Sequence, residues 1–174
     1  MLHIGVPAGV ESAMYAVSNI MIQSAVNELG TSTVAAWTLT GKLDGIYWAV
    51  SNSFGVAIMA FVGQNFGAGR YDRMKKSTRT CLAIAMGFTV VMSALLMLTG
   101  RYCFRIFTTD GEVIDLAVRI MAYFVPYYFV WTFIEVLSNS LRGAGDAVNP
   151  MIIAILGVCG LRVLWLIFVV PVWT

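Results

Sequence analysis

At residues 61–76 the chain reads FVGQNFGAGRYDRMKK, a polar interruption between long apolar stretches. Its first half holds residues that suit a tight turn, because glycine adopts backbone conformations that other residues resist: Gly63, Gln64, Asn65, Gly67, Gly69 and Arg70. Its second half and the residues just beyond it are basic, and they are opposed only by Asp72: Arg70, Arg73, Lys75, Lys76 and Arg79. Membrane proteins keep such an excess on the cytoplasmic side. We therefore predict a loop over residues 63–80, cytoplasmic if the flanking stretches cross a membrane.

The composition indicates that the stretches flanking this loop cross a membrane. The chain has 174 residues, of which 59% are hydrophobic and 11% are charged. A soluble domain carries about 25% charged residues. With so few charges the outer surface must face lipid, so we predict an integral membrane protein with the lipid bilayer as its solvent. The net charge of +2 is too small to indicate nucleic-acid binding.

No catalytic or metal-binding motif is present in the sequence. Cys81, Cys103 and Cys159 are scattered without a C-x-x-C pair, and His3 is the single histidine. Neither a disulfide framework nor a zinc site is expected. Protease, hydrolase, phosphate-loop and dinucleotide signatures are also missing. We therefore predict a non-enzyme without cofactor or metal. The apolar start lacks a basic leader, and we do not expect it to be a cleaved signal peptide.

The apolar stretches predict an all-α bundle. About 20 apolar residues span a bilayer as a helix, and five stretches reach that length: residues 4–26, 33–62, 81–100, 116–141 and 151–173. We predict a single multi-pass bundle over residues 1–174 in the cell membrane. Alternation of sides places the N-terminus, residues 63–80 and residues 141–150 in the cytoplasm. These cytoplasmic loops then carry six Lys and Arg residues, whereas the outer loops carry Arg101 and Arg105.

Charged residues inside the apolar stretches are candidates for function, because each costs about 2.5–3.5 kcal/mol at a helix centre on insertion scales. Glu135 follows Tyr128 and Trp131 at helical spacing, so the three share one face with Ser138. A carboxylate on this aromatic stripe could bind a cation or take up a proton. The alternative is a salt bridge from Glu135 to Arg162 of the next helix, with Arg162 acting as a structural counter-ion.

Two further stripes are candidates for an aqueous pathway. Glu11 lies near the start of the first helix, where Asn19 and Gln23 continue a polar face; these amides could equally join helices by hydrogen bonds. Tyr47 belongs to a similar stripe on the second helix, together with Thr40, Asp44 and Ser51. Counting along that helix places Asp44 near the outer surface, where we expect it to lie in or close to water.

Several stretches together resemble the multidrug and toxic compound extrusion (MATE) family. The order and spacing of five segments match: residues 6–30 (VPAGVESAMYAVSNIMIQSAVNELG), 34–37 (VAAW), 61–74 (FVGQNFGAGRYDRM), 141–151 (LRGAGDAVNPM) and 161–165 (LRVLW). This resemblance implies part of a twelve-helix, two-lobed transporter, with the five helices similar to its seventh to eleventh. It further implies export of small organic, often cationic compounds in exchange for Na⁺ or H⁺.

The resemblance also defines what this chain does not contain. The N-terminal lobe, which would be a partner within the same polypeptide, and the last helix of the second lobe have no counterpart here. The best-known cation-binding aspartate of the family belongs to the first lobe, and the helix that might carry a matching acid has Asn19. Some branches use carboxylates on the first and fourth helices of the second lobe, which here carry Glu11 and Glu135.

Two alternatives remain at the level of sequence. A lipid-linked oligosaccharide flippase of the same superfamily should have a more basic cavity, whereas Arg162 is the one clearly embedded cation here. A truncated, non-transporting membrane protein is the other.

Overall fold

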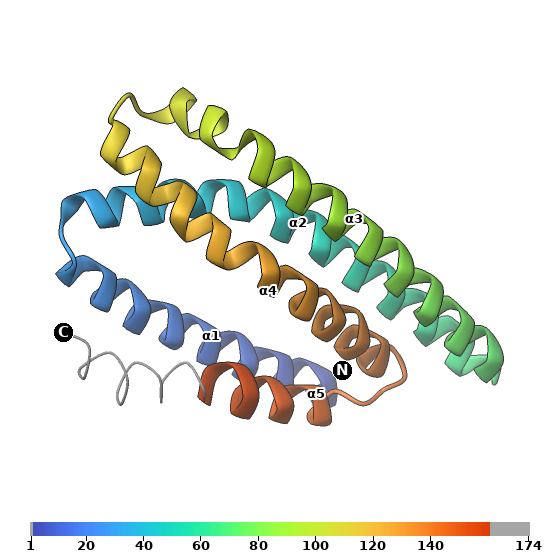
Figure 1. Ribbon diagram of the computed structural model, residues 1–174. Coiled ribbons are helices and arrows are strands. Elements are labelled where there is room, and N and C mark those ends of the chain that lie inside the picture. The colour runs from blue at the N-terminus through green and yellow to red at the C-terminus, as the bar shows by residue number, and fades with distance from the viewer. Residues whose placement is uncertain (1, 161–174) are drawn as a thin grey trace. The chain divides into compact units, whose positions relative to one another are not determined.

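A computed structural model of the chain describes residues 2–160, all of whose regular elements are helices (Figure 1). The elements are α1 (Leu2–Glu28), α2 (Thr31–Gly67), α3 (Tyr71–Phe107), α4 (Gly111–Gly143), α5 (Val148–Ile153) and the π-helix η1 (Ala154–Gly160). The predicted all-α class is confirmed. Most of the predicted helix over residues 151–173, together with Arg162, lies outside the described residues.

The chain divides into two compact units, residues 1–28 with 145–174 and residues 29–144. The first contains α1, α5 and η1, and the second contains α2, α3 and α4. Within the described residues, α2, α3 and α4 are long and apolar enough to cross a membrane, and residues 148–157 form a shorter apolar helix.

The helices of the second unit extend well beyond their apolar stretches. Residues 63–67 belong to α2 and residues 71–80 to α3, so the predicted loop over residues 63–80 contracts to residues 68–70. Likewise, residues 101–107 continue α3 and residues 111–115 begin α4. At 1.5 Å per residue, a helix of 37 residues is about 55 Å long, against about 30 Å of hydrocarbon. Lysine and arginine are good helix formers, so the helices end in turns rather than at the membrane boundary.

The turn between α2 and α3 depends on one glycine. Gly69 has a φ of 68°, in the left-handed region that side chains disfavour. This conformation lets the amide of Arg70 donate to the carbonyl of Asn65 over 2.9 Å. The helix α2 includes Gly63, Gln64, Asn65 and Gly67, which were predicted to lie in the loop. The Asn65 side chain is buried and donates to the carbonyl of Phe61 over 2.8 Å.

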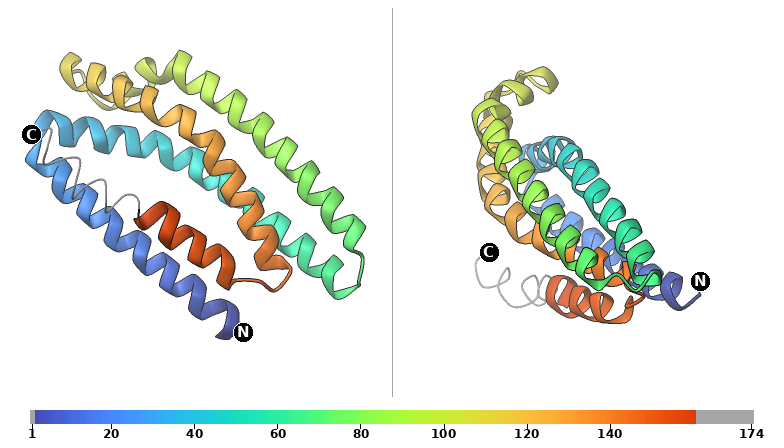
Figure 2. Two further views of the ribbon diagram at one scale, coloured as in Figure 1. Left: turned by 60° about the horizontal axis from the view of Figure 1, so that its bottom comes forward. Right: turned by 90° about the vertical axis from the view of Figure 1, so that its right-hand side faces the viewer.

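Short connections at residues 68–70 and 108–110 make α3 antiparallel to both α2 and α4 (Figures 1 and 2). On α2, Ala36, Leu39, Leu43 and Tyr47 recur at helical spacing and form one core cluster with apolar residues of α3 and α4. A second, smaller cluster comprises Ile58, Val62, Ala85 and Val136. The three helices thus share a core that runs along most of their length.

The ends of α2 and α4 approach closely at two glycines, and at Gly143 no side chain fits without a shift of the backbone. A Cβ at Gly143 would lie 2.5 Å from the carbonyl oxygen of Met59, and a Cβ at Gly63 would lie 3.3 Å from the carbonyl oxygen of Gly143. Gly63 was expected in a loop, and it instead serves helix packing. Small residues at such crossings are a general means of association between membrane helices.

Candidate functional site

Glu135 lies in the interior of α4, half-buried against α2. Its Oε1 accepts a hydrogen bond of 3.0 Å from Nδ2 of Asn139, one turn further along. The same amide nitrogen lies 2.9 Å from the Glu135 carbonyl, which fixes its orientation. On α2 the pair faces Gly55, where a Cβ would lie 2.6 Å from Oε1 of Glu135. The carboxylate therefore lies between two long helices, next to the buried backbone of Gly55.

A second carboxylate, Asp44 of α2, is held by two aromatic donors. The Tyr128 hydroxyl donates to its Oδ1 over 2.6 Å, and the Trp48 indole donates to its Oδ2 over 2.8 Å. Tyr128 is buried and stacks on Tyr47 with ring centroids 4.0 Å apart. Charge-assisted hydrogen bonds of this length are among the stronger ones in proteins. Asp44 is thus integrated into the helix interface.

Three buried hydroxyl groups join α2, α3 and α4 beside these aromatic rings. The hydroxyl of Tyr47 lies 2.8 Å from Oγ1 of Thr132, which in turn lies 2.7 Å from Oγ1 of Thr89. Tyr47 also donates to the carbonyl of Tyr128 over 3.0 Å. Each of these three residues is less than 3% exposed. Because every member has partners, the cluster fixes the relative rotation of the three helices.

Asp44 and Glu135 lie at two heights of the same interface between α2 and α4. Tyr128, the partner of Asp44, precedes Glu135 by seven residues, which is about 10 Å along the helix axis. Between them Trp131 packs on Trp48, with ring centroids 4.4 Å apart. The predicted stripe of Tyr128, Trp131 and Glu135 thus lies along the interface with α2.

The remaining predicted residues lie elsewhere. Glu11 is half-buried and Asn19 is exposed on α1, where Gln23 donates to Asn27 over 3.0 Å. They belong to the first unit, whereas Tyr47 and Glu135 belong to the second. Arg162 lies outside the described residues, so the suggested pair with Glu135 stays a prediction.

Asp44 was expected to lie in or close to water near the outer surface, and that placement stays a prediction. Its side chain is half-buried, and its bonds to two aromatic residues were not predicted. The sequence patterns did not indicate Thr89 and Thr132. The bond to Asp44 could have been predicted from Trp48, which follows Asp44 by one helical turn and can donate to it.

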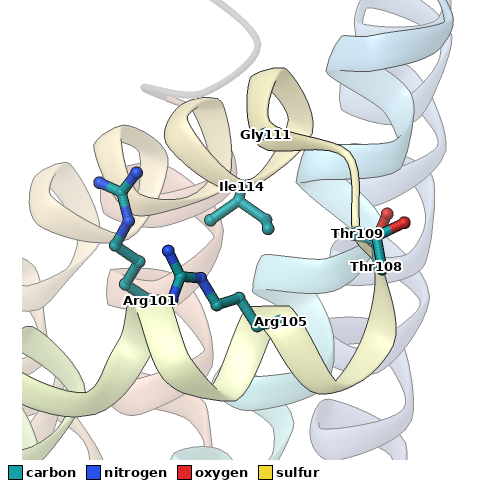
Figure 3. Close-up of a pocket in the computed structure, with 6 residues that line it drawn as sticks. All are labelled: Arg101, Arg105, Thr108, Thr109, Gly111 and Ile114. Carbon is teal, nitrogen blue, oxygen red and sulfur yellow. The ribbon is translucent and has the colours of Figure 1, made fainter.

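A further cavity of about 300 Å³ lies where α3 meets α4, and its lining includes Arg101, Arg105, Thr108 and Ile114. Figure 3 shows both guanidinium groups rising from α3 towards α4. Arg101 is already paired with Asp115 over 2.9 Å, and Asp110 caps α4 by accepting from the amides of Glu112 and Val113. The charge of Arg101 is therefore already offset by Asp115. Within residues 2–160, no group of three or more acidic, histidine or cysteine side chains is placed to hold a metal ion.

Comparisons with known proteins agree over most of the chain. The sequence profile of the MatE family matches residues 7–167. The probable multidrug resistance protein YoeA of Bacillus subtilis is 24% identical over 163 residues, covering 94% of this chain and 35% of that protein. Human multidrug and toxin extrusion protein 1 is 33% identical over 122 residues, covering 68% of this chain and 21% of that protein.

The fold has a counterpart of known structure. A MOP superfamily transporter from Pyrococcus furiosus superposes with a TM-score of 0.90 at 23% identity, over 98% of this chain and 38% of that one. The chain spans well under half the length of each of these relatives.

Proposed function

Since this chain belongs to the MatE family of membrane transporters, we propose that it forms part of a secondary transporter that exports small organic cations in exchange for Na⁺ or H⁺. The complete transporter would comprise the lobe to which this chain belongs and a second lobe, with the substrate cavity between the two lobes. Rocking of two such repeats around a central site is a common means of alternating access. The chain is a multi-pass membrane protein, and we propose the cell membrane as its location.

The observation that carries this proposal is the sign of the charges inside the helices. Among the described residues, three half-buried charged side chains lie in helix interiors, and all three are acids: Glu11, Asp44 and Glu135. The half-buried arginine of the long helices, Arg142, belongs to the last turn of α4. A low-dielectric interior that contains carboxylates favours cations over anions. This supports a cationic substrate as well as a coupling cation or proton.

Glu135 is the residue that we propose to carry the coupling ion. Its Oε1 accepts from Asn139, and the absence of a side chain at Gly55 lets the carboxylate lie between α2 and α4. Ionisable side chains inside membrane helices are characteristic of ion and proton pathways. Asp44 has an aromatic donor on each oxygen, and we assign it a structural role first.

The orientation proposed from the charge count keeps the first turns of α3 in the cytoplasm. They carry Arg73, Lys75, Lys76 and Arg79, which are exposed. Reaction of single cysteines introduced at position 75 or at position 112 with a membrane-impermeant reagent tests this. Position 112 should react from outside intact cells and position 75 should react after the cells are opened; the reverse result would invert the topology.

The transport proposal is tested with the full-length protein in cells that accumulate a fluorescent cationic dye. The protein should lower accumulation, and Glu135→Gln should abolish this effect at equal membrane abundance. Glu112→Gln, which neutralises an exposed acid at the start of the same helix, is the control and should transport normally. Unchanged efflux by Glu135→Gln would remove Glu135 from the mechanism. Failure to transport any cationic dye, with translocation of a lipid-linked oligosaccharide instead, would favour the flippase.

A further inference from the structure

An apolar groove of about 260 Å³ runs between α2 and α3 near the turn that joins them. From α2 it is lined by Phe54, Ala57 and Phe61, and from α3 by Ser77, Thr80 and Ile84. Phe61 is 45% exposed and Ile84 is 57% exposed, so the groove is open rather than an internal void. All of these residues belong to the second unit.

The polar end of the groove faces a basic surface. Ser77 and Thr80 form that end, and Arg73 and Lys76 precede them by four residues each on α3. Residues four apart lie on the same side of a helix, one turn above the other. Arg73 and Lys76 are exposed, and within residues 2–160 neither has an ion pair. Asp72 lies about 100° around the helix from Arg73, but it precedes Lys76 by four residues, so it offsets part of the charge of Lys76 and not that of Arg73.

The depth of this arrangement matches the chemistry of a phospholipid. The apolar part of α3 begins at Cys81, so the groove lies at the level of the acyl chains and the basic turns lie at the level of the phosphates. Basic residues immediately beside a membrane helix attract anionic headgroups. An apolar groove directly beneath such cations adds a seat for one acyl chain.

We propose that this groove, with Arg73 and Lys76 at its mouth, is a binding site for one anionic phospholipid. The two cations contact the headgroup phosphate, and an acyl chain lies along Ala57, Phe61 and Ile84. The other two basic residues of these turns, Lys75 and Arg79, lie about 160° and 120° around α3 from Arg73, away from the groove, and contribute to the general surface charge. The occupant is a structural lipid, and the site does not depend on which compound the protein transports.

The test uses the full-length protein released from bilayers that contain equal amounts of phosphatidylglycerol and phosphatidylcholine, with bound lipids counted by native mass spectrometry. The wild-type protein should retain one phosphatidylglycerol in preference to phosphatidylcholine. Arg73→Gln with Lys76→Gln should lower that retention roughly tenfold. The matched control, Lys75→Gln with Arg79→Gln, removes the same charge from the same helix and should change retention less than about twofold.

A second variant separates the acyl-chain contact from charge. Ala57 is exposed in the groove, so Ala57→Phe fills the groove without entering the helix core, and it should abolish the retained phosphatidylglycerol. Equal losses in the two double variants would overturn the proposal in favour of diffuse surface charge. Effective competition by glycerophosphoglycerol, the same headgroup without chains, would overturn it in favour of a simple phosphate site. Dye efflux is not a readout here, so these results stand apart from the transport proposal.

Discussion

Gly55 of α2 lies directly against the Glu135 carboxylate of α4: a Cβ at position 55 would lie 2.6 Å from Oε1 and 2.5 Å from Nδ2 of Asn139. Both atoms are the ends of flexible side chains, so a larger residue at position 55 would displace the polar pair before it displaced the helix backbone. The absence of a side chain on α2 therefore decides where the acid of α4 lies.

Substituting Gly55 should consequently affect function more than stability. Gly55→Ala should move the Glu135 carboxylate, break its bond to Asn139 and alter the dependence of efflux on the coupling ion by several-fold. Its free energy of unfolding in detergent should change by no more than about 1 kcal/mol, because alanine favours the helix more than glycine does and this offsets part of the strain. Gly41→Ala, where an added Cβ meets nothing within 4 Å, is the control. An unaltered ion dependence would show that the position of Glu135 is not set by Gly55.

Substituting Gly143, in contrast, should affect stability more than function. A Cβ there would lie 2.5 Å from the carbonyl oxygen of Met59 and 3.1 Å from Cβ of Val62, and a backbone oxygen cannot rotate away. Gly143→Ala should separate α2 from α4 and destabilise the protein by about 1–3 kcal/mol, the usual cost of overpacking. Thermal unfolding monitored by circular dichroism measures this. A melting temperature equal to that of the wild type would mean that the two helix ends are free to move apart.

The Asp44–Tyr128 hydrogen bond should behave as a coupled pair. Asp44→Ala and Tyr128→Phe each remove the 2.6 Å bond between α2 and α4, and each should cost about 1–3 kcal/mol. Because one interaction is lost in both, the double variant should be less unstable than the sum of the single variants. A double-mutant cycle of unfolding measures the difference. Strict additivity would indicate that the two groups do not interact energetically.

The turn before α5 predicts a pH-dependent contribution to stability. Asn149 donates to both carboxylate oxygens of Asp146: its side-chain amide over 2.7 Å and its backbone N–H over 3.1 Å. These bonds lower the pKa of Asp146 below its ordinary value. A lowered folded-state pKa adds stability that is fully present above the unfolded value of about 3.9 and is lost as the pH falls through the folded value.

Asn149→Ala should therefore raise the pKa of Asp146 towards that ordinary value. Chemical-shift titration of the isotope-labelled Asp carboxyl carbons follows it directly. Asn52→Ala, a substitution of an exposed asparagine on α2, is a control that should leave the titration unchanged. A pKa of Asp146 that does not move in Asn149→Ala would show that other groups hold its charge.

The helix ends illustrate what local sequence could not decide. The prediction ended helices where apolar runs ended, and so it placed Gly63, Asn65 and the basic residues in a loop. Lysine, arginine and glutamine remain helical in water as readily as leucine does in lipid, and the turn needs only Gly69 and its two neighbours. The end of a hydrophobic stretch marks the membrane boundary, which is a different boundary from the end of the helix.

The sequence by itself determined that this is an all-α membrane protein of a transporter family, because composition, hydropathy and ordered motifs are properties of the chain. It also identified Tyr47, Tyr128 and Glu135 as residues of polar stripes. Only the tertiary structure decided which stripes meet: Asp44 with Tyr128, 84 residues apart, and Gly55 with Glu135. Such pairs depend on the rotation of each helix about its axis and on its height beside its neighbours. Those two variables are set by packing over the whole length of the interface, and no local pattern contains them.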